Sequence, residues 1–136
     1  MRRGVLWDSS AVLAVLDAHD AYHRRAVDAM ARIAAERRPS FMTNYVAAEA
    51  HALVLSRLGR TVAREWLFSD SLPVVRALPQ DEDRAKVILA THNDKDWSLC
   101  DAISFAVLES HGVRTAFTFD HHFRQYGRCD LLGLGT

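Results

Sequence analysis

Four acidic residues, Asp8, Glu49, Asp101 and Asp120, occupy positions from which their side chains could share one site. Asp8 and Asp120 each follow a short apolar run with the pattern of a buried strand. In an open parallel sheet, ligands bind in the crevice outside the carboxyl ends of the strands. Both carboxylates are therefore predicted to face that crevice. Taken singly, each also has a plainer interpretation, as a helix N-cap for Asp8 and a turn residue for Asp120.

Glu49 and Asp101 are predicted to lie on the apolar faces of two helices. Glu49 follows Val46 by three residues and precedes Leu53 by four, and Asp101 precedes Phe105 by four. These spacings place each carboxylate on the same helix face as its apolar neighbours. An unpaired carboxylate on a buried face costs several kcal/mol unless a cation or hydrogen bonds compensate. Both residues therefore need a partner.

A cation shared by the four carboxylates is the simplest such partner. A salt bridge to an arginine, for example Arg57, could compensate one in-facing acid, but there are two, and two more at strand ends. Carboxylates without His or Cys among them suit Mg²⁺ or Mn²⁺ rather than Zn²⁺. Such an ion can activate a bound water and neutralise charge on a phosphoryl oxygen. The site is therefore predicted to hydrolyse phosphodiester bonds.

The elements that must position these acids alternate between strand and helix patterns. Strands are predicted over residues 4–7, 40–43, 73–78 and 113–119, with a short fifth over 130–133. Helices are predicted over residues 11–16, 20–38, 44–58, 61–69, 81–90 and 98–110. This alternation predicts an α/β fold, a three-layer α/β/α sandwich in which helices cover both faces of a central parallel sheet.

Composition indicates one globular domain over residues 1–136, with 49% hydrophobic and 25% charged residues. The 17 basic and 17 acidic residues cancel, which excludes a generically basic nucleic-acid binder. The two cysteines are expected to be reduced. No run approaches about 20 consecutive apolar residues, and an acid at position 8 comes too early for a signal peptide, so we expect a cytoplasmic protein and no membrane partner.

Six short stretches carry a family resemblance. They are DSSAVL (residues 8–13), DAYHRRA (20–26), TNYVAAE (43–49), SLCDAISFA (98–106), TFDHHF (118–123) and YG (126–127). In this order, across residues 5–127, they resemble the PIN-domain nucleases and, among these, the VapC-type toxins of bacterial toxin–antitoxin pairs. Each stretch alone is weakly specific, but the ordered set on the predicted elements is a strong signal.

The resemblance implies a central sheet of about five parallel strands. It also implies that Asp8, Glu49, Asp101 and Asp120 are catalytic ligands of Mg²⁺ or Mn²⁺. In such enzymes the last acid, here Asp120, often supports the ligands from behind or belongs to a second metal. Ser10 is expected to orient a ligand or to touch the substrate. The implied substrate is RNA, often transfer or ribosomal RNA, cut endonucleolytically. The implied partners are a small antitoxin, whose C-terminal segment blocks the active site, and a second copy in a homodimer.

Three alternatives remain open. A phosphomonoesterase that uses an aspartyl-phosphate is disfavoured, because it needs an acid two residues after Asp8, where Ser10 stands. A non-catalytic domain that binds RNA or a protein partner has four intact acids against it. The nearest rival is a PIN nuclease of RNA maturation that is not a toxin, and a short antitoxin reading frame upstream of the gene would separate the two.

Other reactive or apolar residues receive plainer interpretations. Of His121 and His122, we expect one to pack and the other to be solvated. Cys100 is adjacent to Asp101 in sequence and is expected to point to another side of the helix. The apolar run of residues 66–68 is expected to pack in the core more readily than to form a partner surface.

Overall fold

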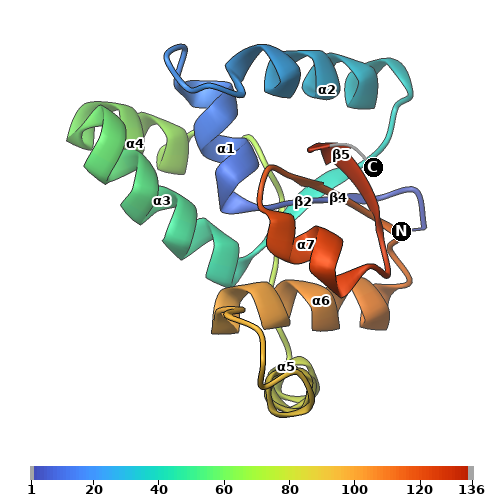
Figure 1. Ribbon diagram of the computed structural model, residues 1–136. Coiled ribbons are helices and arrows are strands. Elements are labelled where there is room, and N and C mark those ends of the chain that lie inside the picture. Colours follow the sequence, from blue (N-terminus) through green and yellow to red (C-terminus); the bar gives the residue numbers. More distant parts are fainter. Residues whose placement is uncertain (1, 135–136) are drawn as a thin grey trace.

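A parallel sheet of five strands forms the centre of the computed structural model, which describes residues 2–134 (Figure 1). The strands are β1 (Val5–Trp7), β2 (Ser40–Thr43), β3 (Val74–Val75), β4 (Thr115–Thr118) and β5 (Asp130–Gly133). Their order is β3-β2-β1-β4-β5, and every neighbouring pair is parallel. The predicted parallel sheet is confirmed. Because the order reverses at β1, the carboxyl ends of β1 and β4 form the crevice in which ligands bind in such sheets.

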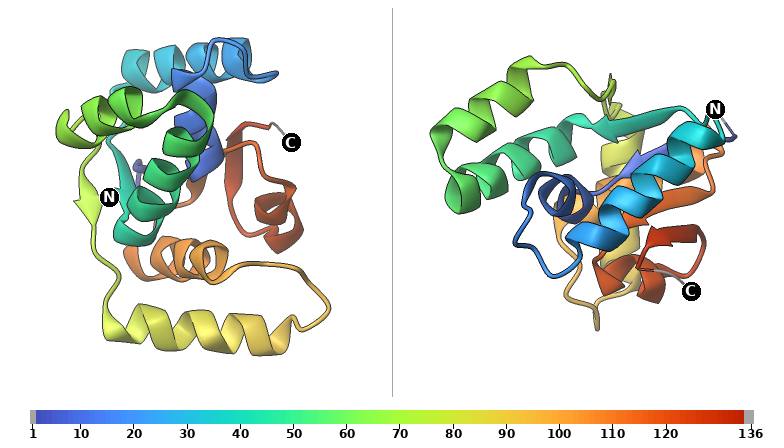
Figure 2. Two further views of the ribbon diagram at one scale, coloured as in Figure 1. Left: turned by 90° about the vertical axis from the view of Figure 1, so that its left-hand side faces the viewer. Right: turned by 90° about the horizontal axis from the view of Figure 1, so that it is seen from above.

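Seven helices are described along the chain. They are α1 (Ser9–Leu16), α2 (His23–Ala35), α3 (Asn44–Leu58), α4 (Arg60–Phe68), α5 (Pro79–Thr91), α6 (Leu99–His111) and α7 (His121–Tyr126). Helices α1 to α4 cover one face of the sheet, and α5 to α7 cover the other (Figures 1 and 2). The three-layer α/β/α architecture is confirmed, with α5 outside α6 (Figure 2).

The position of β1 in the sheet explains why its sequence is continuously apolar. Val5 and Trp7 pack with α1 to α4, whereas Leu6 packs with α6 on the opposite face. All three residues are buried because strands of a parallel sheet are covered on both faces. Asp8 follows this buried strand directly, so the fold places a carboxylate at the end of the central strand.

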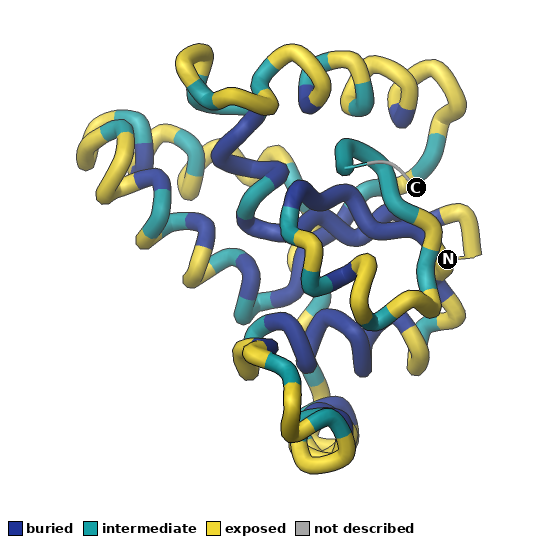
Figure 3. The backbone as a smooth tube through the Cα atoms, in the orientation of Figure 1, coloured by how far each residue is buried: buried dark blue, intermediate teal, exposed yellow. Residues whose placement is uncertain are grey.

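Helix α6 has the longest run of buried residues of any helix in the described part of the chain (Figure 3). Every residue from Asp101 to Leu108 is buried, since the helix lies between the sheet and α5. A helix that is apolar on all sides is typical of such a position. Its first turn points toward the carboxyl ends of the strands and carries Asp101 with it (Figure 1).

The structure differs from the sequence expectation in several elements. Strand β4 ends at Thr118, and residues 121–126 form the helix α7, which was not predicted. Helix α1 begins at Ser9 rather than at residue 11, and Asp8 holds its N-cap position. Strand β3 has two residues rather than six. Among the described residues, no helix combines the length and the apolarity that crossing a membrane requires.

Candidate active site

Asp8 is buried at the end of β1, with 3% of its surface exposed. It holds the N-cap position of α1, but its side chain makes no cap hydrogen bond. Its Oδ2 instead accepts hydrogen bonds from the hydroxyls of Ser10 (2.8 Å) and Thr118 (3.0 Å). Two hydroxyls therefore orient the carboxylate, and only the backbone of Asp8 takes part in capping α1.

The two hydroxyls also join the chain segments that follow β1 and β4. Ser10 Oγ accepts a hydrogen bond from the backbone N–H of Phe119 (3.0 Å), and Thr118 Oγ1 accepts one from that of Asp120 (2.9 Å). Each hydroxyl thus donates to Asp8, while Ser10 accepts from the segment after β4 and Thr118 accepts from its own segment. The structure gives Ser10 a part in orienting Asp8, and contact between Ser10 and the substrate stays a prediction.

Asp101 lies in the first turn of α6 and is buried, as the apolar spacing predicted. Its backbone N–H donates to Ser98 Oγ (3.0 Å), and its Oδ2 accepts from the backbone N–H of Ser98 (3.1 Å). This reciprocal pair is a capping box, which fixes both the start of the helix and the direction of the carboxylate.

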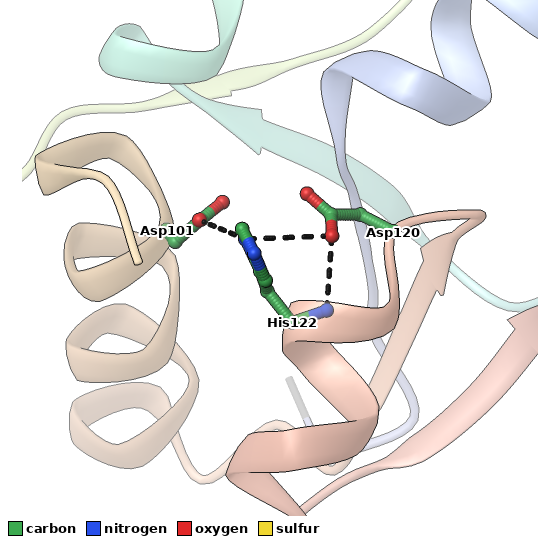
Figure 4. A group of neighbouring side chains, drawn as sticks. All are labelled: Asp101, Asp120 and His122. Carbon is green, nitrogen blue, oxygen red and sulfur yellow. Dashed lines mark hydrogen bonds and ion pairs between the residues drawn. The ribbon is translucent and has the colours of Figure 1, made fainter. Parts of the chain in front are cut away.

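Asp120 and His122 complete a compact group with Asp101 (Figure 4). Asp120 caps α7, because its Oδ1 accepts the backbone N–H of His122 (2.9 Å). The His122 ring turns back between the two acids, with Nδ1 2.9 Å from Asp101 Oδ2 and 3.4 Å from Asp120 Oδ1. One ligand atom from each residue lies within 4.8 Å of the others. This group could hold a metal ion.

His122 is the site residue that the sequence reasoning missed. It is half-buried among the acids, whereas the neighbouring His121 is solvent-exposed. One of the two histidines is therefore solvated, as expected, but the other lies against the acids of the site. The available signal was an Asp followed two residues later by His, which is meaningful only if a helix begins there. Since α7 was not predicted, this signal was not used.

Glu49 lies at the margin of the site rather than in the core. Its residue is exposed on α3, although its Oε1 accepts a hydrogen bond from the hydroxyl of Ser9. The thiol of Cys100 also lies near Glu49. Cys100 was expected to point elsewhere, but its pKa is raised by burial first and then by the charges of Glu49, Asp8 and Asp101. The thiol is therefore part of the acidic cluster.

The electrostatics of Asp8 show how close the carboxylates are. Burial is the main cause that raises its pKa from the ordinary 3.8 to about 6. The charges of Asp101 and Glu49 add to this rise, while the hydroxyls of Ser10 and Thr118 oppose it. Burial and like charges together disfavour ionisation, and a divalent cation among these oxygens would remove both penalties. The residues therefore fit a hard cation such as Mg²⁺ or Mn²⁺.

Comparison with known families agrees with this geometry. The family model described as the PIN domain matches residues 5–128. The chain belongs to the PIN domain family. This PIN domain is 32% identical over 124 residues to the protein named 23S rRNA-specific endonuclease VapC20 of Mycobacterium tuberculosis, a match that covers 88% of this chain and 92% of that protein.

Solved structures give the same family assignment. The crystal structure of Mycobacterium tuberculosis VapC20, described as a sarcin-ricin loop cleaving toxin, superposes with a TM-score of 0.78 and 28% identity, over 91% of this chain and 95% of that one. VapBC2 from Rickettsia felis, bound to a DNA fragment from its promoter, shares the fold with a TM-score of 0.70 and 10% identity, over 94% and 96% of the two chains. The predicted PIN fold and the prediction of a PIN-family nuclease are confirmed.

Proposed function

We propose that this PIN domain is a metal-dependent endoribonuclease of the VapC toxin type, acting as a single nuclease domain over residues 1–136. The proposed active site is the cluster of Asp8, Glu49, Asp101 and Asp120. The observation that carries the proposal is the gathering of buried Asp8 and Asp101 with Glu49 at the carboxyl ends of β1 and β4, where their charges act on one another. A protein keeps such unfavourable contacts where a cation or a reaction requires them.

The chain's own residues hold the carboxylates for Mg²⁺ or Mn²⁺. Ser10 and Thr118 orient Asp8, and the capping box with Ser98 orients Asp101. A bound ion supplies Lewis acidity toward a phosphoryl oxygen and lowers the pKa of a coordinated water. Because the supporting hydroxyls and backbone groups are already in place, little reorganisation is needed before the reaction.

Ribosomal RNA is the first substrate to test, and transfer RNA is the second. The relative that shares 32% identity is named for 23S rRNA, and its solved structure is described as a toxin that cleaves the sarcin-ricin loop. We infer that this chain cuts RNA of the same class, at few sites.

Metal-dependent cleavage of ribosomal RNA by the purified chain tests this function. We expect cutting of isolated 23S rRNA in Mg²⁺ or Mn²⁺, and none in EDTA or with the Asp8→Asn variant, because each change removes the ion or its ligand. Mapping the new 5′ ends would identify the target. Equal cutting by the variant would reveal a contaminating ribonuclease. If antitoxin-free protein cuts neither 23S rRNA nor total RNA, the non-catalytic alternative gains support.

An antitoxin is the partner we propose, and an apolar groove on the α1–α4 side is its docking surface. The groove has a volume of about 790 Å³ and lies away from the acidic cluster. Its lining includes Trp7, Val12, Val15, Leu16, Ile33 and Trp66. Such a groove suits the apolar face of an amphipathic segment. Contrary to expectation, Leu67 and Phe68 beside it on α4 are exposed rather than packed in the core.

Met30→Glu should weaken binding of the small protein encoded beside this gene by tenfold or more. Met30 lines the groove and is exposed, so a glutamate at this position does not disturb the core. Its charge would be buried only when the partner binds, which opposes binding. A tenfold change corresponds to about 1.4 kcal/mol. Isothermal titration calorimetry measures it, with Ala31→Glu on the same helix as the matched control. RNA cleavage by the free chain should not change, and equal binding by both variants would exclude this groove.

Two rival assignments have separate tests. A PIN nuclease of RNA maturation would not arrest growth on induced expression, whereas a toxin arrests growth and co-expression of its antitoxin restores it. The homodimer implied by the resemblance stays a prediction.

A further inference from the structure

The His122 ring occupies a position between two carboxylates that a purely acidic site would not need. Its Nδ1 lies 2.9 Å from Asp101 Oδ2 and 3.4 Å from Asp120 Oδ1. Carboxylates only accept hydrogen bonds, so without a cation the Nδ1–H donates to Asp101. The three side chains come from α6 and from the start of α7, and their polar atoms converge on one point (Figure 4).

The spacing of these atoms matches that of neighbouring ligands on one ion. With metal–ligand distances of about 2.1 Å, adjacent ligands of an octahedral ion are about 3.0 Å apart. The two Nδ1–oxygen distances of 2.9 and 3.4 Å bracket this value. The ligand atoms of all three residues lie within 4.8 Å of one another, so an ion that replaced the Nδ1 proton could be bound by all three after small side-chain movements.

Local structure holds the ring in this place. The His122 backbone N–H donates to Asp120 Oδ1, and the next residue, Phe123, is fully buried and anchors α7. Asp101 Oδ2 accepts the Ser98 N–H, and a carboxylate oxygen has a second lone pair that remains for a metal. Ligands held by such supporting hydrogen bonds are typical of metal sites.

We propose that His122 is a nitrogen ligand of a divalent cation held together with Asp101 and Asp120, and that this nitrogen gives the site a preference for a first-row transition ion over Mg²⁺. The inference deepens the proposed function and rests on its metal-dependent site. Mg²⁺ favours oxygen ligands, whereas imidazole binds transition ions more strongly. Asp8 and Glu49 lie outside this compact group, so the His122 group is one distinct part of the acidic cluster.

His121 provides a matched control for His122. It is the adjacent residue and the same side-chain type, but its side chain is 69% exposed, against 21% for His122, and its Nδ1 is 3.9 Å from Asp120 Oδ1. The variant His122→Asn serves as a second control, because its amide keeps a hydrogen-bonding group close to the Nδ1 position while removing the imidazole nitrogen. A residue that only positions Asp101 should be rescued by this variant.

Pulsed electron paramagnetic resonance of the Mn²⁺-loaded protein tests the proposal without RNA. We expect the nuclear modulation of a directly bound imidazole nitrogen in the wild type and in His121→Ala, and its loss in His122→Ala and His122→Asn. Titrations of Mn²⁺ and Mg²⁺ should show Mn²⁺ affinity falling by about tenfold or more in both His122 variants. Mg²⁺ affinity should change much less, so the preference for Mn²⁺ falls. Unfolding temperatures in EDTA report whether each variant is folded.

Three results would overturn the proposal. They are absence of nitrogen modulation in the wild type, its persistence in His122→Ala, and full recovery of Mn²⁺ affinity in His122→Asn. Failure of the proposed function is a separate outcome, because a protein that binds Mn²⁺ through His122 but cuts no RNA would contradict only the nuclease assignment. RNA cleavage with an unchanged metal preference in His122→Ala would contradict only this inference.

Discussion

Asp8→Asn and Asp101→Asn are each expected to lower the rate of RNA cleavage by about a thousandfold or more while leaving the chain folded. The amide has nearly the size of the carboxylate, and its oxygen can still accept the hydrogen bonds from Ser10 and Thr118, or from the Ser98 N–H. Packing is therefore kept. The lost negative charge removes a ligand for the cation, and with it the stabilisation of charge that develops on the phosphoryl group.

Single-turnover cleavage at saturating Mg²⁺ or Mn²⁺ measures this effect, and thermal unfolding in the same buffer shows that each variant is folded. Asp94→Asn is the matched control, since this acid precedes α6 but its side chain is 72% exposed. The control should cleave at the wild-type rate. Loss of activity that coincides with unfolding, or a site variant that retains its rate, would refute the assigned roles of these carboxylates.

Asp8→Asn should also stabilise the metal-free chain near neutral pH, by up to about 3 kcal/mol. The pKa of Asp8 is raised from 3.8 to about 6 in the folded state. Below 3.8 the group is protonated in both states and contributes nothing. Between 3.8 and 6 the unfolded chain loses the proton that the folded chain keeps, so stability falls as pH rises. Above 6 the penalty is complete, and the amide does not carry it.

Denaturant unfolding in EDTA at about pH 4.5 and about pH 7.5 measures this dependence. The wild type should lose stability between these two pH values relative to Asp8→Asn, and Mg²⁺ should restore it in the wild type more than in the variant, because only the wild type keeps the full set of ligands. A variant less stable than the wild type at about pH 7.5 in EDTA would show that burial and repulsion do not act on Asp8 as described.

Local sequence patterns were sufficient for most of the fold. The helix predicted over residues 44–58 coincides with α3, and Gly59 ends it with a φ of 88°, a conformation that favours glycine. The predicted strand over residues 40–43 coincides with β2. These segments were predictable because each combines a clear periodicity with a local stop signal. Strand β3 has only two residues and α7 has fewer than two helical turns, so the bounds of these two elements could not be predicted from periodicity.

The acidic cluster was partly predictable for the same reason. The positions of Asp8 and Asp120 after strands, and of Asp101 on an apolar helix face, follow from spacing within one element, and the structure places all three at the carboxyl ends of β1 and β4. Their roles in cleavage stay predictions. Glu49 was placed on the correct face of α3, but periodicity did not show that this part of the face lies beyond the core and is exposed.

The order of elements, the parallel sheet, the PIN resemblance and the set of acids could thus be predicted without a structure, because each depends on residues close together in the chain. Three features appear only in the folded chain: His122 faces Asp101 across 21 positions of sequence, Cys100 lies near Glu49, and an apolar groove lies between α1, α2 and α4. Such contacts depend on how helix ends meet the edge of the sheet. That geometry depends on long-range packing, which local periodicity does not predict.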